Sequence, residues 1–188
     1  RRGTPQGGAS SPLLANIYLH RFDTAWRADG LEHRWQARLI RYADDFVVCC
    51  RQTGDQVQAV VAAQLQALGL ALNAAKTRVR DVRQAAFTFL GFTVRQARSR
   101  RTGGWFPLIR PSAGACQRLR ATVKALTGRD RLALPTPAVI TEVNRVVRGW
   151  AGYFHFQHCT RDFSAMRWFV EERVRIYLRR KHRHRTRA

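Results

Sequence analysis

The chain has 188 residues, of which 45% are hydrophobic, so it can bury one core or two small ones and is not a disordered tail. It carries 34 lysines and arginines against 12 acidic residues, a formal net charge of +22 that would repel itself unless a polyanion neutralised part of it. Nucleic acid is therefore the expected partner. Codon bias toward arginine is the plainer alternative, but it does not explain why no acidic residue occurs between Asp81 and Asp130.

The N-terminal part of the chain favours a helix followed by a hairpin. Residues 10–28 open with two serines and a proline, continue with an apolar stripe at helical spacing, and are stopped by Gly30. Residues 38–50 place two short apolar runs on either side of Asp44 and Asp45. This pattern predicts a tight antiparallel hairpin that carries both carboxylates at its turn.

A second helix and two strands are expected next. Residues 55–68 repeat valine and leucine along one helix face, and Gly69 supplies the C-terminal stop. Short strands are expected at 77–82 and 87–95. Together these elements predict an α+β layer in which helices cover one face of an antiparallel sheet.

The composition changes after Arg95, because residues 95–104 are basic and turn-rich, whereas the pattern from Ser112 onward is helical. We therefore predict a domain boundary near Arg110. The expected domains are residues 1–110, a helical domain at 111–180 and a basic tail at 181–188.

Three helix starts are expected in the second half, at Ser112, at Thr136 followed by Pro137, and at Asp162. They predict a small three-helix bundle whose arginines point outward. The terminal residues 179–188 are expected to form a frayed, solvated tail. The expected bundle core is Trp150, Phe154, Trp168 and Phe169.

Two adjacent carboxylates on a turn indicate a metal site. Asp44 and Asp45 would be costly to pack together without cations, and a divalent metal removes that cost. Hard oxygen ligands suit Mg²⁺, which usually takes one or two carboxylates and completes its shell with phosphates and water, so phosphoryl transfer is implied. The alternative is an ordinary exposed turn, where such pairs are common.

The cysteines show neither zinc nor disulfide spacing, and no signal peptide or long apolar run is present. We predict a reduced protein of the bacterial cytoplasm, associated with RNA or the nucleoid, and no membrane partner. His155, His158 and Cys159 lack a fourth metal ligand and are interpreted as core or surface residues.

Five blocks follow one another along the chain: residues 3–8 (GTPQGG), 11–19 (SPLLANIYL), 42–45 (YADD), 72–77 (LNAAKT) and 89–92 (FLGF). In this order and spacing they resemble successive blocks of group II intron reverse transcriptases. Residues 148–154 (RGWAGYF) resemble the thumb or maturase region of the same family. The resemblance implies half of a polymerase palm followed by a thumb. Because the sequence begins inside the first block, we expect a C-terminal fragment without the fingers.

The resemblance assigns metal chemistry to the YADD block. Asp44 is expected to bind two catalytic Mg²⁺ ions and Asp45 to support or share one of them. The two metals would stabilise the attacking 3′ oxygen and the departing pyrophosphate. Tyr42 is expected near the primer end or the nucleotide, with Ala43 as the small residue of the motif. The family needs a further Asp from an upstream strand before Arg1, so the fragment alone is expected to be inactive. Four other aspartates are interpreted as poor substitutes: Asp23, Asp29, Asp55 and Asp81.

Other blocks imply contacts with substrate. Gln6 and Gly7 are expected near the template and nucleotide, and Lys76 near the triphosphate, although a plain turn and a surface lysine would show the same residues. The primer grip is expected at Leu90, Gly91 and Phe92, which a core strand would equally contain.

Two sets of arginines are expected to bind RNA through phosphates and unstacked bases. The turn-rich stretch contributes Arg95, Arg98, Arg100 and Arg101. The thumb contributes Arg145, Arg148, Arg173, Arg175, Arg179 and Arg180.

We therefore predict an α+β protein, a partial polymerase palm followed by a three-helix thumb. Its predicted function is that of the C-terminal portion of an RNA-directed DNA polymerase that copies intron RNA by two-metal phosphoryl transfer and assists splicing. The expected partners are intron RNA, an RNA template with a DNA primer, and deoxynucleotide triphosphates. The alternatives are a non-catalytic RNA-binding splicing factor and a domesticated or defence-associated reverse transcriptase.

Overall fold

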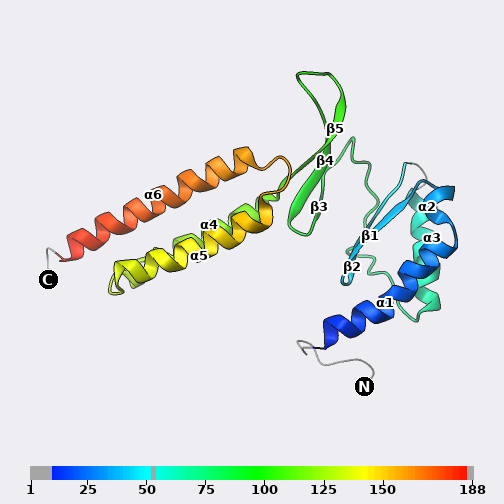
Figure 1. Cartoon of the computed structure of the whole chain (residues 1–188), viewed down its shortest axis with the longest axis horizontal. Coiled ribbons are helices and arrows are strands. Elements are labelled where there is room, and N and C mark those ends of the chain that lie inside the picture. The colour runs from blue at the N-terminus through cyan, green and yellow to red at the C-terminus, as the bar shows by residue number, and fades with distance from the viewer. Residues whose placement is uncertain (1–9, 52–53, 186–188) are drawn as a thin grey trace. The chain divides into compact units, whose positions relative to one another are not determined.

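The computed structural model describes residues 10–51 and 54–185, and the chain forms two compact units (Figure 1). The units divide between Arg80 and Asp81, and each has its own antiparallel sheet, helices and apolar core. This mixed architecture confirms the predicted α+β fold class. Within the described ranges, no helix combines the length and the apolar character needed to cross a membrane.

The first unit builds three helices around a two-stranded hairpin. Pro12 lies in the first turn of the first helix, where its missing N–H is tolerated, and Gly30 follows the helix with a φ of +63°. The two predicted helices and the predicted hairpin are confirmed to within one residue at their ends. The elements are α1 (Ser11–Ala28), α2 (Leu31–Arg34), β1 (Arg38–Tyr42), β2 (Asp45–Cys49) and α3 (Gly54–Ala67).

The core of the first unit lies between α1, α3 and the hairpin. Phe22 and Trp26, one helical turn apart on α1, are each only 1% exposed. The ring of Phe22 lies 5.5 Å from that of Phe46 in β2, so the core reaches the hairpin. The third helix adds a buried stripe at i, i+4 spacing: Val57, Val61 and Leu65.

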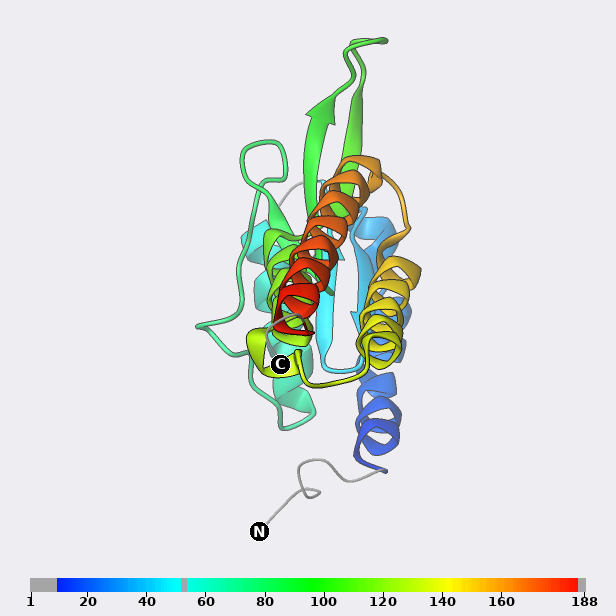
Figure 2. The same ribbon diagram turned by 90° about the vertical axis from the view of Figure 1, so that its left-hand side faces the viewer.

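The second unit joins a three-stranded sheet to a helical bundle. The strand order is β3-β4-β5, and both pairings are antiparallel. The far end of the β4–β5 hairpin extends clear of the helices of its unit (Figures 1 and 2). The elements are β3 (Phe87–Phe89), β4 (Phe92–Arg98), β5 (Trp105–Pro111), α4 (Ala113–Leu126), a 3₁₀ turn (Arg129–Arg131), α5 (Thr136–Phe154) and α6 (Thr160–Arg185).

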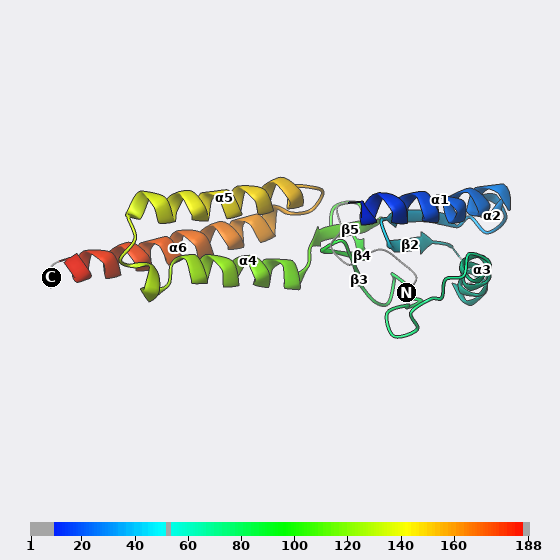
Figure 3. The same cartoon turned by 90° about the horizontal axis from the view of Figure 1, so that it is seen from below.

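The predicted three-helix bundle is present, and its helices run side by side (Figure 3). Trp150 and Phe169 pack against its buried residues, as expected, and Phe154 is itself buried. The expectation for Trp168 is wrong, because its side chain is 68% exposed. The helical period turns Met166 and Phe169 inward and leaves Trp168 on the opposite side of α6.

The strand predicted at 77–82 is absent, because residues 77–81 form no regular element and lie between turns at 74–76 and 82–84. The carbonyl of Asn73 accepts the amides of Lys76 and Thr77, and the Asp81 side chain accepts the amide of Arg83. These local hydrogen bonds compete with strand pairing. The predicted strand at 87–95 is instead a hairpin, β3 and β4.

The second unit differs from the sequence-based predictions at three further places. The strand β5 was not predicted, because its two prolines suit only a sheet edge, which is where it lies. Asp162 lies inside the first turn of α6 and not before it. The basic segment expected to fray from residue 179 is helical as far as Arg185. The predicted domain boundaries at residues 110 and 180 stay predictions.

The turn between β3 and β4 is docked on the end of α5. Leu90 and Gly91 form this two-residue turn, and both have positive φ, as a type I′ turn requires. The Tyr153 hydroxyl donates to the Leu90 carbonyl at 3.0 Å, and the ring of Phe92 lies 4.9 Å from that of Phe154. The FLGF and RGWAGYF blocks therefore meet in one contact.

This docking predicts opposite effects for two glycine substitutions. Gly91 has a φ of +79°, and an added Cβ would lie 3.1 Å from Cζ of Phe154. We expect Gly91→Ala to lower the free energy of unfolding by about 1–2 kcal/mol. Gly149 lies within α5 with open space around it, so Gly149→Ala should raise stability by about 0.5–1 kcal/mol. Urea unfolding followed by circular dichroism measures both, and equal effects would contradict the docking.

Candidate functional site

The two adjacent carboxylates lie on an exposed hairpin turn, as the sequence predicts. Tyr42 pairs with Asp45 at the end of the β1–β2 ladder, and Ala43 and Asp44 form the connection. Both aspartates are exposed, and neither carboxylate has a hydrogen-bond or ion-pair partner among the described residues. The turn thus presents acidic oxygens that the surrounding structure does not neutralise.

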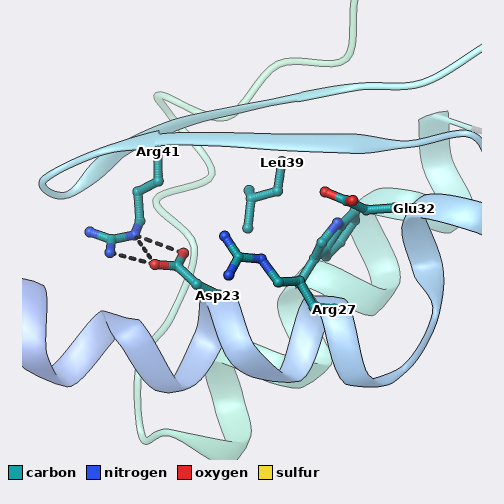
Figure 4. Close-up of a pocket in the computed structure, with 6 residues that line it drawn as sticks. Asp23, Arg27, Glu32, Leu39 and Arg41 are labelled. Atoms are coloured by element: carbon teal, nitrogen blue, oxygen red, sulfur yellow. Dashed lines mark hydrogen bonds and ion pairs between the residues drawn. The ribbon is translucent and has the colours of Figure 1, made fainter.

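A half-buried arginine braces this turn by connecting it to α1, and Figure 4 shows its bonds to Asp23. Arg41 lies two residues before Ala43, and its guanidinium donates to the Ala43 carbonyl at 2.8 Å. The same group donates to both carboxylate oxygens of Asp23, at 2.9 and 2.6 Å, and to the side chain of Asn16 at 2.9 Å. Asn16 and Asp23 are two turns apart on α1 and so share one face of it. One side chain therefore ties the turn to the helix.

The environment of Arg41 makes this brace strong. Its side chain is 12% exposed and that of Asp23 is 20% exposed, so water competes little for the bidentate pair. The hydrogen bond that Arg41 donates to Asp23 raises the pKa of the Arg41 guanidinium, although burial opposes the shift. Arg41 is therefore charged at neutral pH. The sequence analysis did not identify this pair.

A small pocket of about 160 Å³ adjoins the brace. Charged groups lie at its edges, and Leu39 and Trp26 form its apolar part (Figure 4). Its size suits a few water molecules and not a nucleotide. The lining residues are Asp23, Trp26, Arg27, Glu32, Leu39 and Arg41.

The turn fits a magnesium site in its donor chemistry. Asp44 and Asp45 supply the hard oxygen ligands that Mg²⁺ takes from proteins, one or two carboxylates at a time. No group of three metal-ligating side chains occurs in residues 10–51 and 54–185. Asp23 is committed to Arg41, and Asp29 accepts a hydrogen bond from Gln64 at 2.7 Å. Both of these aspartates therefore have partners within the first unit.

The residues expected to contact the nucleotide are only partly described. Gln6 and Gly7 lie outside the described residues. The Tyr42 ring is 65% exposed, so it is available to a ligand and does not pack on a neighbour. Lys76 is exposed on the turn that follows Asn73. Its ammonium has no partner in the described part of the chain.

The expected primer-grip residues and arginines all lie in the second unit. Leu90, Gly91 and Phe92 pack on α5, so part of their role is structural. Arg173 differs from the expectation, because its half-buried guanidinium donates to the carbonyl and hydroxyl of Thr127 at the end of α4. Most of the others are exposed: Arg95, Arg98, Arg100, Arg101, Arg145, Arg148, Arg175 and Arg179, with Arg180 half-buried.

Two family models match consecutive parts of the chain. A model for reverse transcriptase (RNA-dependent DNA polymerase) matches residues 1–94, which is half of the 188 residues. A model for the group II intron maturase-specific domain matches residues 116–188. The boundary expected near Arg110 lies between these two matches.

Two curated proteins are similar to the chain. An uncharacterized 91 kDa protein in the cob intron of Schizosaccharomyces pombe is 23% identical over 238 aligned residues, covering 89% of this chain and 30% of that protein. Protein YkfC of Escherichia coli is 34% identical over 129 residues, covering 52% of this chain and 34% of that protein. The chain thus spans about a third of the length of these relatives.

The brace at Arg41 predicts a measurable coupling. Arg41→Ala leaves the Asp23 carboxylate without its partner and removes a donor from the Ala43 carbonyl, so we expect a loss of about 2 kcal/mol in unfolding free energy. In a double-mutant cycle with Asp23→Ala, the double variant should lose less than the sum of the two single losses. Arg83→Ala is the matched control, because its pair with Asp81 is exposed and should contribute little. Additive losses at Arg41 and Asp23 would contradict the brace.

Proposed function

Because the chain belongs to the reverse transcriptase family and carries a group II intron maturase-specific domain, we propose that it is part of an RNA-directed DNA polymerase that copies intron RNA and also binds that RNA to assist splicing. The proposed polymerase activity rests on the exposed turn that contains Asp44 and Asp45. Arg41 holds this turn by a hydrogen bond, and the turn lies in the segment that matches the reverse transcriptase model. The maturase half is supported by the match to residues 116–188 and by the net charge of +22.

In the proposed reaction, the chain's own residues position the reactants. Asp44 would hold two Mg²⁺ ions and Asp45 would share one of them, and these metals would supply the positive charge that stabilises the attacking 3′ oxygen and the leaving pyrophosphate. Tyr42 is exposed beside the carboxylates and contacts the primer end or the nucleotide. Lys76 pairs with the triphosphate, and Gln6 and Gly7 approach the template and nucleotide.

Rigidity of the turn supports this assignment. Metal-assisted transfer requires ligands held in one geometry before the substrate arrives. The carbonyl of Ala43, directly before Asp44, is fixed by Arg41, which is itself fixed by Asp23 and Asn16 on α1. A solvated turn without a function would need no such chain of hydrogen bonds to a neighbouring helix.

The second candidate function is an RNA-binding splicing factor without polymerase activity, and the maturase-specific match favours it equally. Primer extension by the longer protein that contains this chain separates the two candidates. DNA synthesis on an RNA template supports the polymerase, whereas splicing assistance without synthesis supports the second candidate.

The first prediction from the proposal concerns Asp44. In the longer protein, Asp44→Asn should abolish DNA synthesis, because it removes the charge that holds the metals, and should largely spare RNA binding. Asp55→Asn is the matched control, because Asp55 is an exposed aspartate in the first turn of α3. Primer extension and filter binding on the same preparations measure both activities. Loss of both activities in Asp44→Asn would contradict a purely catalytic role.

The second prediction concerns the thumb arginines. Replacing exposed arginines of α5 and α6 with Glu should weaken binding to structured RNA and reduce the slope of log affinity against log salt by about one unit per lost phosphate contact. The substituted set is Arg145, Arg148, Arg175 and Arg179.

The control set has the same number of exposed arginines away from the thumb: Arg27, Arg34, Arg51 and Arg83. A salt titration by filter binding compares the two sets. Indistinguishable slopes would show that a uniformly basic surface binds RNA and that no dedicated face exists.

A further inference from the structure

The far end of the β4–β5 hairpin carries an exposed indole among arginines. Trp105 is the first residue of β5 and pairs directly with Arg98, the last residue of β4. Residues directly opposite in an antiparallel ladder lie on the same face, so these two side chains are neighbours. The indole is 63% exposed, and its side chain has no ring contact or hydrogen bond within the described residues.

The loop that closes this hairpin is held in one conformation by its own hydrogen bonds. The amide of Ser99 donates to the Gly104 carbonyl at 2.8 Å, and the amide of Gly103 donates to the Ser99 carbonyl at 2.9 Å. The Ser99 hydroxyl accepts the amide of Thr102 at 3.2 Å. Arg98 Nε donates to the Gly103 carbonyl at 2.9 Å, which directs this guanidinium along the tip. The tip is therefore ordered before any ligand arrives.

The charge at the tip is uncompensated. Arg100 and Arg101 are exposed on the loop, and neither has an ion-pair partner in the part of the chain that the structure describes. No acidic residue occurs in the sequence between Asp81 and Asp130, so none lies on either strand of this hairpin. A ligand for this tip must offer negative charge together with a flat apolar surface for the indole.

We propose that the tip of the β4–β5 hairpin binds an unpaired nucleotide, with Trp105 stacked on the base and Arg98, Arg100 and Arg101 paired with the flanking phosphates. The inference deepens the proposed RNA-binding function and rests on it, so the nucleotide is assigned to RNA. Base faces are accessible to an aromatic side chain only where the strand is unpaired, because a duplex covers them with neighbouring bases. A hairpin that extends clear of the bundle can enter a loop or bulge (Figure 2).

The tip fits an unpaired nucleotide better than it fits a duplex or an acidic peptide. A duplex presents phosphates to the arginines but leaves the indole in water. An acidic peptide presents carboxylates but no face that matches an indole. The preformed loop also lowers the entropic cost of binding, since its backbone is already ordered.

The test compares the 188-residue chain with three tryptophan variants on four labelled probes: a hairpin RNA with a single-stranded loop, a blunt RNA duplex, a single-stranded RNA and a DNA strand of the same sequence as this last probe. Trp105→Ala should weaken binding to the probes with unpaired RNA at least about fivefold and leave binding to the duplex unchanged. Trp105→Phe should keep most of the affinity, because a phenyl ring also stacks. Trp168→Ala is the matched control, an equally exposed tryptophan on α6, and should bind like the parent chain.

Each other outcome overturns a defined part of the argument. Normal RNA binding by Trp105→Ala overturns the stacking site and leaves the proposed function intact. Equal weakening on the duplex and on unpaired RNA shows that the tip does not recognise unpaired bases. Tighter binding of the parent chain to the DNA strand assigns the tip to DNA. Absence of RNA binding by the parent chain at low salt overturns both the inference and the maturase function.

Discussion

The hydrogen bonds of Arg41 are the interaction on which the candidate chemistry of the first unit depends. The turn after β1 contains Ala43 at a φ of +53°, a conformation that a residue with a Cβ adopts at a cost and that needs support from outside the ladder. A planar guanidinium gives that support, because its donors reach the Ala43 carbonyl and the Asp23 carboxylate at once. The supporting ion pair is half-buried, whereas Asp44 and Asp45 are exposed. The unit thus separates the residues that hold the site from those that would react.

Cations have a similar internal role in the second unit. Arg110 pairs with Asp162 in the first turn of α6, and Arg173 donates to Thr127, the residue that follows α4. Lys181 donates to the carbonyls of Leu132 and Leu134 in the connection between α4 and α5. Carbonyls at helix ends and in connections need donors, and arginine and lysine supply them. The formal charge of +22 therefore overstates the number of cations whose donors are available to RNA.

Local sequence signals predicted most of the elements, and the failures have a common physical origin. Ser112 caps α4 through the amide of Ala115, as its position before a helical pattern indicates. The failed strand at 77–82 and the unpredicted β5 both depend on whether a neighbouring strand is available, which local propensity does not report. The prediction that Trp168 is buried fails for the same reason. An indole favours burial, but the neighbouring helices decide which face of α6 is packed. The YADD motif was enough to identify Asp44 and Asp45 as candidate site residues. The pair of Arg41 and Asp23 could not be predicted in this way, because these residues are 18 positions apart and only the fold brings them together.

A polyanion is attracted most strongly to arginines that have no carboxylate partner. The distribution of such partners therefore matters more than the total number of arginines. On α6, Arg167 and Arg175 pair with Glu171 and Glu172, so much of their field is cancelled within one helical turn. At physiological salt the field of an exposed charge is screened within about 8 Å, so a carboxylate nearby matters more than the net charge of the chain. The sequence from 82 to 129 contains no carboxylate, and the whole β4–β5 hairpin lies within it. At the tip of this hairpin Arg100 and Arg101 have no carboxylate partner among the described residues, so under the proposed RNA-binding function their charge would be fully available to phosphates.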